Sequence, residues 1–167
     1  IRVPLGIWTD KYGGRIVLFV LMMTTVIPIY MMQYATAYWH FIVIGLFIGL
    51  AGGSFSVGTP YVARWFERDQ QGMAMGIFGA GNAGSSLTKL IAPAIIAWAG
   101  WQMVPQVYAG IMLVTAILFW LFSYSDPKHL VSSNVTLGSQ LALMKNPSVL
   151  RYCQLYSVVF GGYVALA

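Results

Sequence analysis

The sequence predicts an all-α membrane protein, a polytopic bundle of helices that cross the bilayer. Of its 167 residues, 59% are hydrophobic and 8% are charged, whereas about a quarter of a soluble domain is charged. Apolar runs of membrane-spanning length follow one another along the chain. The lysines and arginines between these runs gather in alternate connections, as the positive-inside rule requires.

Four runs are long enough to span a bilayer, which takes about 20 mostly apolar residues. They are Ile16–Tyr34, Phe41–Ala63, Gly72–Ala99 and Val104–Tyr124. Ile1–Trp8 is typical of the end of an earlier helix, and Tyr152–Ala167 of the start of a later one. Because the chain opens without an initiator methionine and closes inside an apolar run, we expect it to be the central, incomplete part of a longer protein.

One connection is long and polar. Residues 125–150 contain Asp126-Pro127 and Asn146-Pro147, and we interpret them as a linker between two bundles. Basic residues lie in the first loop, the third loop and this linker, which places all three in the cytoplasm. The opposite side carries the aromatic residues expected of an interfacial belt: Tyr34, Tyr38, Trp39, Trp98 and Trp101.

Composition also excludes several functions. The net charge is +5, but the basic residues are scattered at segment ends, so we expect no nucleic-acid partner. A lone Cys153 forms no internal disulfide, and His40 and His129 lack metal-ligand spacing, so no metal or cofactor is expected. A membrane enzyme would need paired carboxylates, metal ligands or an activated nucleophile at membrane depth. Every acidic residue instead lies in a loop.

The first loop carries the pattern Gly6-x-x-x-Asp10-Lys11-x-Gly13-Gly14-Arg15. Its glycines allow a tight turn, and we expect Asp10 and Arg15 to pair across it or to cap neighbouring helix ends. An ordinary charged loop is the alternative. The pattern resembles the loop between helices 2 and 3 of the major facilitator superfamily.

This resemblance implies a fold and a register. Residues 1–124 would run from late helix 2 to helix 6 of the N-terminal six-helix bundle. Residues 125–150 would be the cytoplasmic loop between bundles, and residues 151–167 the start of helix 7 in the C-terminal bundle.

The apolar run Gly72–Ala99 contains the glycine-rich stretch Gly79-Ala80-Gly81-Asn82-Ala83-Gly84. Glycines in a membrane helix let another helix or a ligand approach the backbone closely. An asparagine at this depth needs a polar partner. The stretch therefore fits either a ligand site or a helix-packing face with an incidental asparagine.

Several polar and aromatic residues share a similar depth. Counted at 1.5 Å per residue from the cytoplasmic helix ends, they lie roughly 8 to 15 Å deep in a core about 30 Å thick: Arg2, Phe55, Asn82, Tyr156 and Phe160. Transporters bind substrate near this midplane. The planar guanidinium of Arg2 suits a small planar oxyanion, whose faces phenyl rings can sandwich. Alternatively, Arg2 snorkels to an interface.

Four motifs in the same order resemble the nitrate/nitrite porter family of the major facilitator superfamily. They are Arg2-Val3-Pro4, Ala51-Gly52-Gly53-Ser54-Phe55, the stretch Gly79-Ala80-Gly81-Asn82-Ala83-Gly84, which looks like that family's nitrate signature, and Tyr156-x-x-x-Phe160-Gly161. The resemblance implies transport of nitrate, nitrite or both by alternating access, in a multi-pass protein of a bacterial inner membrane.

The resemblance also assigns roles within a site of which this chain would hold about half. Arg2 would clamp the anion, the signature would hydrogen-bond it through Asn82, and aromatic rings would stack on it and close the site. The residues so assigned are Arg2, Phe55, Gly79, Gly81, Asn82, Tyr156 and Phe160.

Lys89 follows Asn82 by seven residues, which places it on the same helix face two turns outward. It either lines the outward pathway, with a part in proton coupling, or snorkels to the outer interface. The pair Thr88-Lys89 looks like the proton-linked branch of the family, which favours symport with protons as the coupling ion. A carrier of another small organic or phosphate anion is the alternative function, and a purely structural membrane scaffold would not explain Arg2 at midplane depth.

Overall fold

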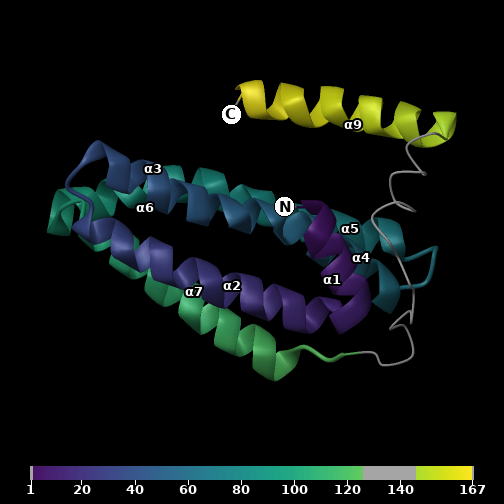
Figure 1. The fold of residues 1–167 in the computed structure, drawn as a ribbon, viewed down its shortest axis with the longest axis horizontal. Coiled ribbons are helices and arrows are strands. Elements are labelled where there is room, and N and C mark those ends of the chain that lie inside the picture. The colour runs from purple at the N-terminus through teal and green to yellow at the C-terminus, as the bar shows by residue number, and fades with distance from the viewer. Residues whose placement is uncertain (1, 126–145, 167) are drawn as a thin grey trace. The chain divides into compact units, whose positions relative to one another are not determined.

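The computed structural model describes residues 2–125 and 146–166, and only the backbone of residues 2, 3, 160 and 163–166. The chain divides into two compact units, Ile1–Val131 and Ser132–Ala167, and each is described by itself. All regular structure in the described residues is helical (Figure 1).

The first unit begins with α1 (Arg2–Tyr12) and α2 (Gly14–Met31), which a 3₁₀ turn extends to Tyr34. Two long helical passages follow, and each is interrupted by a 3₁₀ turn. They consist of α3 (Tyr38–Ile48), η2 (Gly49–Gly53) and α4 (Ser54–Trp65), and then of α5 (Gln71–Gly79), η3 (Ala80–Asn82) and α6 (Ala83–Ala99). The unit ends with α7 (Met103–Phe122).

The second unit contains α9 (Pro147–Leu166). This helix begins inside the segment 125–150 that the sequence predicts as a linker. The rest of that segment, apart from residues 125 and 146, lies outside the described residues.

Three segments of the described residues are long and apolar enough to cross a membrane: Gly14–Tyr34, Tyr38–Trp65 and Met103–Phe122. They correspond to three of the four predicted spans, which are thereby confirmed. The fourth, Gly72–Ala99, folds into the passage α5–η3–α6 but does not reach the same hydropathy. Its polar side chains, which the sequence interpretation underweighted, explain the difference: Asn82, Ser85, Ser86, Thr88 and Lys89.

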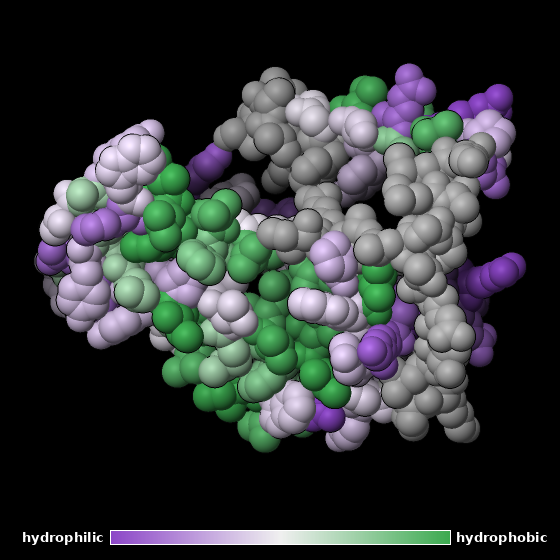
Figure 2. Space-filling view, viewed as in Figure 1, coloured by the Kyte–Doolittle hydropathy of each residue, from purple (hydrophilic) through white to green (hydrophobic). Residues whose placement is uncertain are grey.

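Helix α2 is the centre of the first unit. It packs along α7 and also contacts α1, α3 and α4 (Figure 1). The buried core lies around it and is composed of Leu5, Val17, Leu18, Leu21 and Val57. Figure 2 shows hydrophobic residues over the middle of this unit and hydrophilic residues nearer its ends, which is the distribution expected of a bundle that crosses a bilayer.

The first loop is tight because of its glycines. Gly13 has a φ of 88°, which non-glycine residues rarely adopt, and it separates α1 from α2. Gly14 follows and is buried against α4, where a Cβ atom added to it would lie 2.6 Å from the Cβ atom of Tyr61. The absence of a side chain at Gly14 therefore sets how closely α2 approaches α4.

The predicted pairing of Asp10 with Arg15 is wrong. Asp10 accepts a 2.6 Å salt bridge from Nη2 of Arg64, in the last turn of α4. Arg15 instead donates a 2.6 Å hydrogen bond to the carbonyl of Trp120, and its guanidinium lies 4.4 Å from the centroid of the Trp120 ring. Arg15 thus caps the end of α7, as the alternative expectation held. Asp10, near the end of α1, and Arg15, at the start of α2, therefore lie in helices rather than in a loop, and they join α1 to α4 and α2 to α7.

The opposite end of the unit is joined by uncharged groups. The side-chain amide of Gln106, on α7, donates a hydrogen bond to Oε1 of Gln33, in the 3₁₀ turn that extends α2. Phe41 and Trp101 pack with their ring centroids 6.3 Å apart. The residues of the predicted aromatic belt are all exposed: Tyr34, Tyr38, Trp39, Trp98 and Trp101. Such side chains are suited to a membrane–water interface.

We predict that Gly14→Ala destabilises the protein by about 1–3 kcal/mol, because the new methyl group overlaps Tyr61 close to the α4 backbone. The matched control is Gly45→Ala on α3, where an added Cβ has no atom within 4 Å. The melting temperature of the full-length protein in detergent is the measurement. Equal melting temperatures for the two variants would contradict the close approach at Gly14.

Candidate functional site

The candidate site lies where the two interrupted passages carry their 3₁₀ turns. Phe55 is the second residue of α4, the helix that directly follows η2. Asn82 is the last residue of η3. Three of the five residues of η2 are glycines, and η3 lies in the glycine-rich stretch that the sequence singles out. A 3₁₀ segment in the middle of a helix often marks a functional hinge.

The structure connects Phe55 to the signature segment through a residue that sequence analysis did not single out. The rings of Phe55 and Phe78 lie 5.2 Å apart between centroids at an interplanar angle of 67°. Phe78 is the penultimate residue of α5 and immediately precedes the signature. The signal that could have revealed it is its position one helical turn before Asn82, but a phenylalanine in an apolar helix is usually only packing.

Phe78 fits against α4 because Gly58 has no side chain. A Cβ atom added to Gly58 would lie 2.5 Å from Cζ of Phe78. Gly58 is buried, and its neighbour Val57 is fully buried in the core. Gln71, at the start of α5, adds a 3.0 Å hydrogen bond from Nε2 to the carbonyl of Ala63 on α4. The two helices are thus held together along the length of α5.

The glycines of the signature have open space beside them. Within the part of the chain that the structure describes, a Cβ atom added to Gly79, Gly81 or Gly84 would have no neighbour within 4 Å. The side chain of Asn82 is exposed in the same region, and the backbone carbonyl of Asn82 accepts a 2.9 Å hydrogen bond from the Ser85 hydroxyl. These glycines therefore do not serve to pack the described helices together, which weakens the interpretation as a packing face within this unit.

The remaining predicted site residues are placed only in part. Arg2 is the first residue of α1, and its side chain lies outside the described residues. Tyr156 and Phe160 are one turn apart on α9 in the second unit, and Tyr156 is exposed there. The exposed Lys89 lies on α6 four residues before Pro93, a proline inside the same helix.

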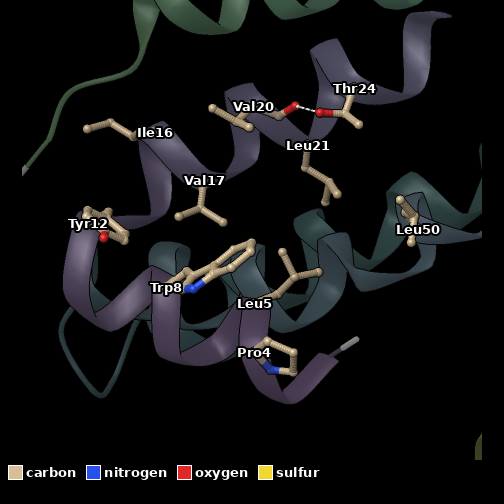
Figure 3. Close-up of a pocket in the computed structure, with 10 residues that line it drawn as sticks. All are labelled: Pro4, Leu5, Trp8, Tyr12, Ile16, Val17, Val20, Leu21, Thr24 and Leu50. Atoms are coloured by element: carbon tan, nitrogen blue, oxygen red, sulfur yellow. Dashed lines mark hydrogen bonds between the residues drawn. The ribbon is translucent and has the colours of Figure 1, made fainter. Parts of the chain in front are cut away.

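A separate cavity of about 580 Å³ lies between α1 and α2 and has a different character (Figure 3). Its walls are mainly apolar and include Pro4, Leu5 and Leu21. The Thr24 hydroxyl at its edge donates a 2.7 Å hydrogen bond to the Val20 carbonyl, as the dashed line in Figure 3 shows. The lining residues carry no charge, so this cavity is not suited to an anion.

Together, the helical unit, its membrane-length segments and its polar, glycine-rich break define an integral, multi-pass membrane protein with the construction of a transporter. The chain belongs to the Major Facilitator Superfamily, whose family model matches residues 1–167. This confirms the predicted all-α membrane fold, and it identifies the chain as belonging to a family of transporters rather than of enzymes.

Comparison with curated proteins narrows the relationship. The chain is 36% identical to the "Probable nitrate/nitrite antiporter NarK1" of Thermus thermophilus, over 99% of the chain and 40% of that protein. It is 30% identical to the "Nitrite extrusion protein" of Bacillus subtilis, over 99% of the chain and 41% of that protein. It is 32% identical to the "Probable nitrate transporter NarT" of Staphylococcus epidermidis, over 99% of the chain and 42% of that protein.

These relatives confirm the resemblance to nitrate/nitrite transporters that the sequence motifs suggested. The chain spans about two-fifths of the length of the relatives it matches. No solved structure matches it.

Proposed function

We propose that this chain forms the central part, from late helix 2 to early helix 7, of a carrier that moves nitrate, nitrite or both across the membrane by alternating access. The observation that carries the proposal is the break at η3, where Asn82 and glycines with open space beside them follow Phe78, whose ring packs against Phe55 of α4. A polar break of this kind in a membrane helix offers hydrogen-bond donors at the depth where transporters hold substrate.

The five site residues other than glycine each have a proposed role. The guanidinium of Arg2 binds two oxygens of the anion with its planar fork, and the amide of Asn82 donates a further hydrogen bond. The ring of Phe55 stacks on the planar anion, and Tyr156 and Phe160 close the site from the second bundle. In this arrangement residues 1–124 belong to the first bundle, 125–150 connect the bundles, and 151–167 begin the second.

The coupling mechanism depends on Lys89. A cation on α6, two turns beyond Asn82, suits proton-coupled symport if it faces the pathway. The names of two relatives, an antiporter and an extrusion protein, favour exchange or export instead. A carrier of another small organic or phosphate anion is the second candidate, because a midplane arginine suits many oxyanions.

We predict that the full-length protein, reconstituted in proteoliposomes, takes up labelled nitrate, and that excess nitrite competes whereas excess sulfate does not. A site of planar donors and phenyl rings with few charges neutralises a doubly charged tetrahedral anion poorly. Competition by sulfate without competition by nitrite would overturn the proposed substrate class.

We predict that Arg2→Lys lowers nitrate uptake more than tenfold without loss of the folded protein. Lysine keeps the charge but loses the bidentate geometry of the guanidinium, and each ~1.4 kcal/mol lost from binding is tenfold in affinity. The matched control is Arg68→Lys, an exposed loop arginine, which should leave uptake unchanged. Near-normal uptake by well-expressed Arg2→Lys would show that Arg2 supplies only charge.

We predict that Lys89→Ala changes the pH dependence of uptake while the KM for nitrate rises only modestly, because Lys89 lies roughly 10 Å along the helix axis from Asn82. Lys89→Arg distinguishes a role of the positive charge from a role in proton release, because arginine keeps the charge but does not release its proton. Uptake is measured across a pH series with and without a proton gradient. An unchanged profile in both variants would remove the reason to prefer symport over exchange.

A further inference from the structure

Phe78, a phenylalanine in an apolar helix of the first unit, packs closely against both a second phenyl ring and the neighbouring helix α4. Phe78, at the end of α5, meets the ring of Phe55 at 5.2 Å and 67°, an edge-to-face arrangement. Its tip rests on α4, where a Cβ atom on Gly58 would lie 2.5 Å from its Cζ atom and 2.8 Å from its Cε2 atom. The ring therefore cannot move further toward the α4 backbone.

The position of Phe78 in the chain connects this contact to the break. Gly79 is the last residue of α5, and the 3₁₀ turn Ala80–Asn82 begins directly afterwards. Asn82 follows Phe78 by four residues, which is roughly 6 Å along the helix axis. The signature glycines have open space around them, so they give the turn little lateral support within this unit. Phe78 is thus the side chain that ties the start of the break to α4.

The angle of the Phe55 ring matters for an anion because a phenyl ring has a negative face and a positive edge. A free anion is attracted to the edge and repelled by the face, whereas a planar anion already paired with a guanidinium can stack on the face. Either contact requires that the ring stay at a fixed angle. A ring free to rotate would present the unfavourable orientation for part of the time, and it would lose entropy on binding.

We propose that Phe78 is a positioning residue of the anion site, which fixes the angle of the Phe55 ring. The proposal rests on the proposed transport of nitrate or nitrite. Phe78 acts through Phe55 and does not itself touch the anion. Gly58 contributes to the same positioning, because only a residue without a side chain leaves room for the Phe78 ring.

The test compares nitrate uptake by proteoliposomes that contain the full-length protein or its variants. Phe78→Leu removes the flat ring and leaves an apolar side chain. It should raise the KM for nitrate about two- to tenfold, the range that a lost aromatic pair corresponds to, with little change in the maximal rate. Gly58→Ala should raise the KM in the same direction by displacing the ring. Gly72→Ala, on α5 with nothing within 4 Å, is the matched control and should leave the KM unchanged.

A double-mutant cycle with Phe55→Leu distinguishes positioning from simple packing. If Phe78 acts through Phe55, then Phe78→Leu in the Phe55→Leu background should add little to the KM beyond Phe55→Leu alone. Its effect on the melting temperature should persist in both backgrounds, because packing is lost in either case. If Gly58→Ala does not fold, Phe78→Leu and the cycle with Phe55→Leu carry the test alone.

Two results would overturn the proposal, and they differ from failure of the proposed function. An unchanged KM in folded Phe78→Leu, or fully additive rises in KM within the cycle, would show that Phe78 is only packing while nitrate transport stands. A wild-type protein that takes up neither nitrate nor nitrite would overturn the proposed function itself, and the role of Phe78 with it.

Discussion

The bilayer requires that every backbone N–H and C=O group within it find a partner inside the protein, and this requirement shapes the first unit. The 3₁₀ turns that interrupt its helices also follow this requirement. At the end of η2 the N–H of Ser54 bonds the carbonyl of Ala51, and at the end of η3 the N–H of Ala83 bonds the carbonyls of Ala80 and Gly81. The helices can therefore change geometry at mid-length while these backbone N–H groups stay paired.

The two ends of the first unit are secured by different chemistry. At the predicted cytoplasmic end, the salt bridge of Asp10 and Arg64 and the contact of Arg15 with Trp120 join helices that are far apart in the sequence. At the other end the contact between Gln33 and Gln106 is uncharged. Arg15 and Arg64, which form these contacts, are among the basic residues from which the positive-inside rule predicts this end to be cytoplasmic.

The sequence predicted what depends on local composition and missed what depends on distant partners. Hydropathy located three of the spans, and the motif order identified the family. The partner of Asp10 lies 54 residues away and that of Arg15 lies 105 residues away, so no local spacing could indicate either. Phe78 is similar, because its significance appears only when α4 and α5 are seen together. The 3₁₀ turns escaped prediction because glycines are equally compatible with continuous membrane helices.

The turn η2 also changes the rotational phase of the passage that contains it. Each 3₁₀ residue advances by about 120° rather than about 100°, so its five residues turn α4 by about 100° relative to an uninterrupted continuation of α3. Side chains on α4 therefore point to a different side from the one that counting along α3 would give. In this passage, the side chains before the turn and those after it therefore face different directions around the helix axis. Helical-wheel diagrams drawn across Gly49–Gly53 would misassign the orientation of Phe55 by about a quarter of a turn.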